Sequence, residues 1–354
     1  MIHRLLAAAA AFALVPPAAA QEAPPASPSP GEIVDAAPVA DWVAIAPSDL
    51  LMMELVPDAA GKSRRVVIQL MPAPFSQGWI GNIRKLAAAH WWDGTSINRV
   101  QDNYVVQWGD ATEKKPLPEG LVTVPESEYM SAYALGMFRF RYSQIGRVTA
   151  AYRMTGIGFG APVRYSDSYA ASAAFVGGFP IAMSLRLREA TAAEGRTSLF
   201  GAGTEDQNRF SEPDMVWPVH CYGMVGVGRN LSPDTGTGAE LYAVIGHAPR
   251  HLDRNIALVG RVVEGIEHLS SLPRGTGALG FYEEDAQRVP IASIRIASEL
   301  PTSAQPRFEY LSTESASFAK YADARANRRD PFFIRPAGGA DICNIPVPVR
   351  AMAR

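Results

Sequence analysis

The 354-residue sequence contains only two cysteines, Cys221 and Cys343. No cysteine or histidine pair shows the spacing of a structural zinc site, so we expect no metal site. The formal net charge of -2 provides no basic excess to neutralise phosphates, which argues against a nucleic-acid-binding protein. No apolar run approaches twenty residues outside the N-terminus, so no transmembrane segment is expected after removal of the N-terminal segment.

Two common enzyme signatures are also missing. The sequence has no Gly-x-Ser-x-Gly motif, which disfavours an α/β-hydrolase. The run Gly223–Gly228 looks like a dinucleotide-binding fingerprint, but no helix and no ribose-binding acid follow it as a βαβ unit requires. We therefore expect no cofactor. With 47% hydrophobic and 19% charged residues, the composition is that of a globular protein with a sizeable core.

The N-terminus has the pattern of a bacterial signal peptide over residues 1–20. Met1–Arg4 is a short basic start, Leu5–Val15 is apolar, and Ala18–Ala20 is a small-residue cleavage site. This pattern predicts export and a periplasmic location. The alternatives are that the segment remains as an uncleaved membrane tether or forms a buried first helix.

Residues 21–40 are rich in Pro, Ala and Ser, which predicts an extended linker, with ordered structure beginning near Asp41 and Trp42. The two cysteines have two possible interpretations. In an oxidising compartment they form a disulfide that ties the C-terminal region to the core; otherwise they are two buried thiols. The sequence does not supply the distance that would decide between them.

The residue pattern of the remaining chain is mostly that of strands. They are expected at about 49–55, 65–70, 97–100, 104–108, 221–227, 240–245, 257–263 and 291–297. A helix is predicted over 76–90, because Ile80, Ile83, Leu86 and Ala87 share one face, and a second near 264–272. Two helices among eight antiparallel strands indicate a mainly β fold, in which a closed barrel leaves no exposed sheet edge.

Residues 111–218 are too long for a structureless loop, so we expect an α+β insert. Within it, alternation of Phe138, Phe140 and Tyr142 with arginines predicts a strand, 166–175 a helix and 177–180 a turn, whereas 191–208 is expected to be mobile. Residues 301–354 form a C-terminal extension with a predicted helix over 312–328, followed by an extended "IPVPV" segment.

Two predicted strands in the first half carry polar side chains that are costly to bury. Arg99 and Gln107 belong to "SINRVQDNYVVQWGD", and each would cost roughly several kcal/mol if buried without a partner. They therefore either pair inside the core or stand at its edge and meet a ligand. The first possibility has a natural partner in Asp110.

Two blocks of sequence resemble one known family. The first block includes Asn82–Leu86, Trp92–Thr95, Asn98–Val100 and Gln107–Asp110; the second is "HLDRNIALVGRVVEGIEHL". Together they resemble the cyclophilin family of peptidyl-prolyl cis-trans isomerases over about residues 48–110 and 219–298. The resemblance implies a closed eight-stranded antiparallel cyclophilin-like β-barrel over 41–300, capped by two helices and interrupted by the insert at 111–218.

The resemblance also implies roles for individual residues. Arg99 and Gln107 match the catalytic arginine and glutamine of the family. Positions matching its substrate contacts are Tyr104, Val105, Gly226, Tyr242, His251 and Leu252. Three of the departures from the family pattern are Gly226 for an Asn, His251 for an aromatic ring and Ile256 for a His. Glu240 stands where the family has a Gln.

From these residues we expect a peptidyl-prolyl isomerase that assists the folding of exported proteins. Its partners would be Pro-containing segments of unfolded or flexible proteins. One alternative is a weak or inactive module that only binds proline segments. Another is a structural or assembly factor of the envelope, in which the barrel is a scaffold. The sequence does not indicate an oligomeric state.

Overall fold

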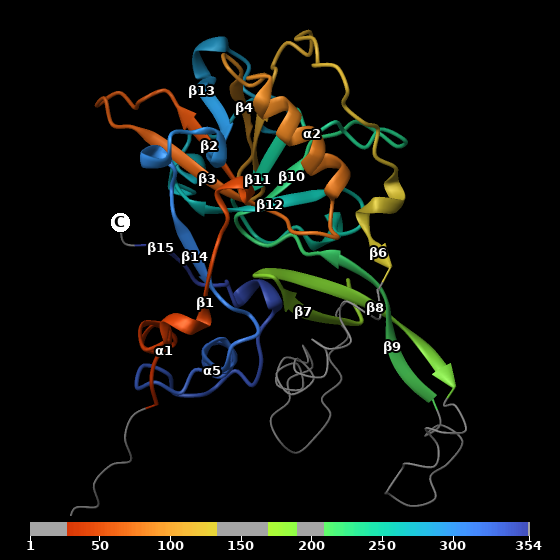
Figure 1. The fold of residues 1–354 in the computed structure, drawn as a ribbon, viewed down its shortest axis with the longest axis vertical. Helices are drawn as coiled ribbons and strands as arrows, with labels where there is room; N and C mark the ends of the chain where they lie inside the picture. Colours follow the sequence, from red (N-terminus) through yellow and green to blue (C-terminus); the bar gives the residue numbers. More distant parts are fainter. Residues whose placement is uncertain (1–26, 133–168, 190–208, 353–354) are drawn as a thin grey trace, which may run out of the picture.

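The protein is described from a computed structural model, which covers residues 27–132, 169–189 and 209–352. Its largest element is a closed antiparallel barrel, as the sequence predicts (Figure 1). In hydrogen-bonded order its strands are β10 (Met224–Val227), β11 (Leu241–Val244), β5 (Val105–Gly109), β4 (Ser96–Val100), β13 (Val289–Ile296), β2 (Leu50–Leu55), β3 (Arg64–Leu70) and β12 (Leu258–Glu264).

Two helices accompany the barrel. Helix α2 (Gln77–Ala88) buries Ile80, Ile83, Leu86 and Ala87, which confirms the apolar face expected from their spacing. Helix α4 (Glu267–Ser270) is a single turn near β3, shorter than the predicted 264–272. Because the buried residues of α2 belong to the same core cluster as the barrel interior, this helix covers the barrel with apolar side chains.

The insert supplies a second sheet. Its strands, in hydrogen-bonded order, are β6 (Ser131–Ala132), β9 (Arg209–Pro218), β8 (Phe179–Glu189) and β7 (Ser172–Val176). Strand β7 occupies the last four residues of the segment expected to be a helix over 166–175, so that prediction is wrong for residues 172–175. The expected turn is present, because Gly177 and Gly178 join β7 to β8 with φ values of +56° and +85°. The predictions for 138–142 and 191–208 lie outside the described residues.

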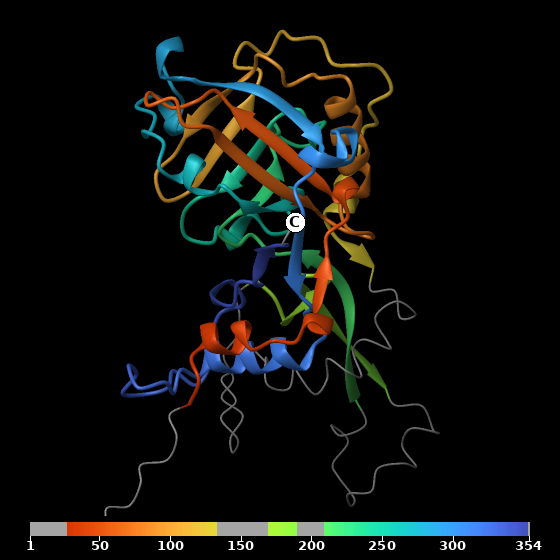
Figure 2. The ribbon, with the colours of Figure 1, turned by 60° about the vertical axis from the view of Figure 1, so that its left-hand side comes forward.

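The C-terminal extension forms a third unit with the N-terminal residues. Strands β1 (Trp42–Ala44), β14 (Phe308–Leu311) and β15 (Val349–Ala351) make a three-stranded sheet, so β1 pairs with the extension and not with the barrel. Helices α1 (Pro30–Asp35) and α5 (Ala316–Ala326) lie side by side next to it (Figure 2). Helix α1 falls in the expected linker 21–40.

A buried cation joins the barrel to both additional units. Arg261 of β12 is 8% exposed and donates from Nε to Gln69 of β3 at 2.9 Å. Its guanidinium carbon lies 5.0 Å from the ring centre of Phe179 in the insert and 5.8 Å from that of Tyr310 in the extension. A desolvated cation between two rings is held by both of them, so the insert and the extension meet the barrel at a common point. No helix in the described ranges has the length and apolarity of a membrane span.

Candidate active site

A groove of about 670 Å³ opens where β4, β5 and β11 adjoin. Six of the eight predicted site residues line it: Arg99, Tyr104, Val105, Gln107, Tyr242 and Leu252. They come from segments up to 153 positions apart in the sequence. The fold therefore brings the two blocks that resemble the cyclophilin family to one surface.

One end of the groove is apolar. In the β5–β11 ladder Val105 pairs with Val244 and Gln107 with Tyr242. Residues two apart in a strand share a face, so these side chains point outward while their neighbours fill the barrel. Val105, Tyr242 and Val244 form a small buried cluster, separate from the main core, against which Tyr104 and Ile256 pack. Four of these five residues, Tyr104, Val105, Tyr242 and Ile256, line the groove and form its apolar cup.

Arg99 lies at the polar end of the groove, at a register shift between β4 and β5. Its Nε donates to the main-chain oxygen of Leu279 at 2.8 Å and its Nη1 to Gln107 Oε1 at 3.2 Å, while Nη2 donates to Gln101. A guanidinium has five N–H groups, so within the described part of the chain two of them are left for a ligand. The rings of Tyr104 and Phe281 flank its charge at 5.7 and 5.4 Å.

The predicted alternative, a pair between Arg99 and Asp110, is wrong. The carboxylate of Asp110 accepts instead from the main-chain N–H groups of Thr112, Lys114 and Lys115. Burial tends to raise the pKa of Asp110, but these hydrogen bonds hold it below its ordinary value. Asp110 is therefore satisfied by its own loop, and the arginine remains directed to the groove.

Glu240 also lines this polar end. Its Oε1 accepts from the main-chain N–H of Asp110 at 2.7 Å, and the nearby side chains of Gln107 and Asn98 interact with the same carboxyl group and tend to lower its pKa. Burial raises the pKa of Glu240 to about 7, because desolvation of the charge outweighs these hydrogen bonds. The carboxyl group fits only because residue 109 is glycine: a Cβ there would lie 1.9 Å from Oε1.

The two remaining predicted site residues do not line the groove. Gly226 lies behind the Tyr242 ring, where an added Cβ would fall 2.3 Å from Cζ and Oη, and Gly228 lines the groove instead. His251 is exposed and stacks on Tyr104, with ring centres 6.3 Å apart and planes 11° apart. Gly226 thus makes room for the floor of the cup, and His251 supports one of its walls.

A buried hydrogen-bonded chain fixes Tyr242 from behind. His220 Nδ1 lies 2.9 Å from Asp253 Oδ1, and His220 Nε2 lies 2.9 Å from the Tyr242 hydroxyl. Burial lowers the pKa of His220 and outweighs Asp253, which raises it. The lowered pKa favours a neutral imidazole ring. An ionised Asp253 only accepts, so Nδ1 carries the proton and the Tyr242 hydroxyl donates to Nε2.

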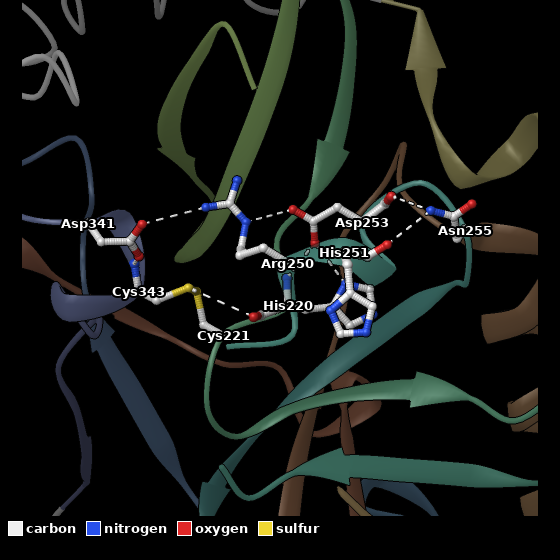
Figure 3. Close-up of polar contacts among 8 residues, drawn as sticks. All are labelled: His220, Cys221, Arg250, His251, Asp253, Asn255, Asp341 and Cys343. Atoms are coloured by element: carbon white, nitrogen blue, oxygen red, sulfur yellow. Dashed lines mark hydrogen bonds and ion pairs between the residues drawn. A yellow bond between two sulfur atoms is a disulfide. The ribbon is translucent and has the colours of Figure 1, made fainter. Parts of the chain in front are cut away.

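The same chain continues to the C-terminal extension (Figure 3). Asp253 Oδ2 accepts from Arg250 Nε at 2.7 Å, and Arg250 Nη1 lies 3.6 Å from Asp341. Burial would raise the pKa of Asp253, but its partners His220 and Arg250 hold it below the ordinary value. Next to this chain Cys221 and Cys343 form a disulfide with a Cα–Cα distance of 5.1 Å, which decides between the two interpretations of the cysteines.

Several site residues have no signal in the sequence. His220 reaches Asp253 and Tyr242 only through the fold, and the segment carrying Leu279 and Phe281 meets Arg99 across about 180 positions. Asn98, by contrast, belongs to the sequence motif Asn98–Val100. Its interaction with Glu240 has no signal in that motif. Within the described ranges, no three His, Cys, Asp or Glu side chains are grouped so that they could hold a metal ion.

Comparison with known proteins gives a structural likeness only. No family model matches the sequence, and no curated protein matches it. Among solved structures, the cyclophilin AquaCyp293 from Hirschia baltica has a TM-score of 0.58 at 19% identity, over 88% of this chain and 93% of that one. Two structures of a cyclophilin-type peptidyl-prolyl cis-trans isomerase from Cryptosporidium parvum, one with the dipeptide Ala-Pro, have TM-scores of 0.33. They are 9% and 10% identical and cover 69% and 70% of this chain and 98% and 97% of theirs.

The two sequence blocks predicted a closed eight-stranded antiparallel barrel, and the structure contains one. The structural likeness to AquaCyp293 supports the same architecture. The protein therefore has a cyclophilin-like fold.

Proposed function

We propose that the protein is a peptidyl-prolyl cis-trans isomerase acting on Pro-containing segments of unfolded or flexible exported proteins. The observation that carries the proposal is the guanidinium of Arg99, which has two N–H groups left within the described chain and lies beside an apolar cup. Rotation about an X-Pro bond faces a barrier of about 18–20 kcal/mol, because resonance makes the C–N bond partly double. No covalent chemistry is needed.

The site residues fit the two tasks of such a catalyst. The cup of Tyr104, Val105, Tyr242 and Ile256 receives the proline ring in this proposal, and Gln107 faces the substrate backbone. As the bond twists, conjugation is lost and the prolyl nitrogen regains a lone pair that an N–H of Arg99 can bind. A donor that binds only the twisted form lowers the barrier without stabilising either planar isomer.

The test is an isomerisation assay that uses no protease, by NMR exchange on short X-Pro peptides with varied X. We expect exchange between cis and trans signals to accelerate in proportion to protein concentration. Line broadening without acceleration would support the second candidate function, a module that binds proline segments. That alternative is favoured by His251 and Ile256, which differ from the family at substrate-facing positions.

Export is a separate part of the proposal, supported by the basic start, the apolar run and the small residues before Gln21. We expect mass spectrometry of envelope fractions to find Gln21 at the N-terminus. An Ala20→Arg variant should keep its N-terminal segment, because a large charged residue does not fit a small-residue cleavage site. An intact Met1 on wild-type protein in the cytoplasmic fraction would refute export.

A further inference from the structure

The carboxyl group of Glu240 and the guanidinium of Arg99 approach the Gln107 amide from opposite ends. The oxygen of that amide accepts from Arg99 Nη1 at 3.2 Å, and its nitrogen lies on the side of Glu240: an added Cβ on Gly228 would fall 3.4 Å from Gln107 Nε2 and 2.9 Å from Glu240 Cβ. The interaction with Gln107 lowers the pKa of Glu240, as expected when an N–H group of the amide faces a carboxylate, which can only accept. The amide oxygen is thereby left directed to Arg99.

Glu240 itself is held by the backbone and has little freedom to move. Its Oε1 accepts from the N–H of Asp110, and the glycine at 109 leaves the space that this oxygen fills. The carboxyl group thus lies in a space bounded by the main chain of Gly109 and Asp110, at the end of β5, the strand that carries Gln107. Any change in its hydrogen bonding is transmitted to the amide and not absorbed by a rotation of the Glu240 side chain.

Protonation of Glu240 would change the hydrogen-bonding groups that its carboxyl presents to Gln107. A neutral carboxyl group has an O–H donor, which needs an acceptor nearby. Two are present: the amide oxygen of Gln107 and Oδ1 of Asn98, a buried atom with no hydrogen-bond partner among the described residues. If Gln107 turns to accept this proton, its NH₂ group faces the Arg99 guanidinium, and two donors oppose each other.

We propose that Glu240 is a positioning residue that keeps the Gln107 amide oxygen on Arg99, so that the charge on Glu240 controls the isomerisation rate. This inference rests on the proposed function and adds to it a residue and a pH dependence. It concerns a position where the family has a glutamine, which cannot be charged.

Of the two carboxyl groups at this end of the groove, Glu240 has a raised pKa and Asp110 a lowered one, so Glu240 is the one that changes charge near neutral pH. Asp110, directly after β5, is the charged group that opposes ionisation of Glu240, and hydrogen bonds keep the pKa of Asp110 low. The other charged groups facing the groove are Arg99 of β4, Arg229 and Asp234 of the β10–β11 loop, Glu113 and Lys115 after β5, and Arg288 before β13. With the pKa of Glu240 at about 7, its carboxyl group is charged at pH 8 and neutral at pH 6.

The experiment compares wild type with Glu240→Gln between pH 6 and pH 8. Wild-type kcat/KM should fall about fivefold towards pH 6, the difference between a charge-assisted and a neutral hydrogen bond. The Glu240→Gln variant should show a flat profile, and Glu264→Gln, an exposed carboxyl group outside the groove, should follow wild type. A wild-type profile in Glu240→Gln would overturn the inference and leave the isomerase assignment standing.

A second measurement does not depend on activity or on the folding of a variant. The side-chain NH₂ signals of Gln107 in ¹⁵N-labelled wild type, assigned by their loss in Gln107→Met, should shift with a midpoint near pH 7. Signals that do not move between pH 6 and pH 8 would refute a role for Glu240. If wild type has no isomerase activity, the proposed function fails together with the effect on the rate, and this titration alone decides whether Glu240 positions the Gln107 amide.

Discussion

Alanine in place of Arg99 should lower kcat/KM for X-Pro isomerisation by on the order of 10²–10³, the usual cost of removing one preorganised electrostatic donor. The side chain is the cation that the structure holds between Gln107 and the rings of Tyr104 and Phe281, beside the cup. Peptide binding should weaken much less, because the cup is left intact. Isomerisation and binding are therefore measured on the same X-Pro peptide.

Two variants serve as controls for this loss. Arg99→Lys keeps the charge but not the planar fork, so we expect an intermediate rate. Arg274→Ala removes a neighbouring arginine that pairs with Asp102 outside the groove and should isomerise like wild type. Unchanged activity in Arg99→Ala would refute the catalytic role. Loss of the circular-dichroism spectrum would identify Arg99 as a structural residue instead.

Asparagine in place of Asp253 should lower the free energy of unfolding by about 3–5 kcal/mol, as expected when a buried ion pair loses one partner. Asp253 and Arg250 are 1% and 6% exposed. An amide there would place its NH₂ group against Arg250 Nε or against His220, and Arg250 would lose its nearest carboxylate partner. Urea denaturation at pH 7 measures the difference between the two proteins.

The matched control is Asp323→Asn, at a pair with Arg329 in which the two side chains are 49% and 54% exposed. Exposed pairs contribute about 1 kcal/mol or less, so this variant should unfold nearly as wild type does. The pKa of Asp253 lies below 3.8, so its contribution is present above that pH and is lost as the pH falls through the folded-state value. Equal stability of both variants would contradict the buried pair.

The barrel was predictable because its signals are local. Most of the strands β2–β5 and β10–β13 are short, mainly apolar runs, and α2 carries an apolar face at helical spacing. The same local rule would have found α1. Ser29 and Glu32 form a capping box around Pro30, a pattern readable in the sequence, but the proline-rich composition favoured an extended linker.

Strand β7 shows where local signals mislead. Its alanines and the preceding Ser and Asp residues favour a helix, yet Ser172–Val176 pairs along its whole length with β8 through the Gly177–Gly178 turn. Cross-strand pairing and burial of Phe175 against Phe318 of the extension override the helix preference of alanine, because intrinsic propensity is weak compared with tertiary contacts. Neither partner strand nor Phe318 can be inferred from the residues of β7 alone.

The site was predictable as far as the family motifs extend. Arg99, Gln107 and the cup residues belong to those motifs, whereas the support behind Tyr242 depends on His220, 22 positions away, and on Asp253, 33 positions from His220. Such contacts have no sequence periodicity, because the barrel closure creates them. The role proposed for Glu240 depends also on the space that Gly109 leaves for its carboxyl group, and this space exists only in the folded protein.

The disulfide has a consequence for the order of events during synthesis. Cys343 follows every strand of the barrel, and its partner Cys221 adjoins the histidine that fixes Tyr242. Because a chain is made from its N-terminus, this crosslink can form only after the whole barrel and most of the extension have been made. A ribosome-attached or truncated chain that lacks residue 343 has no covalent lock beneath the cup. The crosslink therefore marks chains that extend at least to Cys343, and nonreducing electrophoresis can separate crosslinked chains from those that lack it.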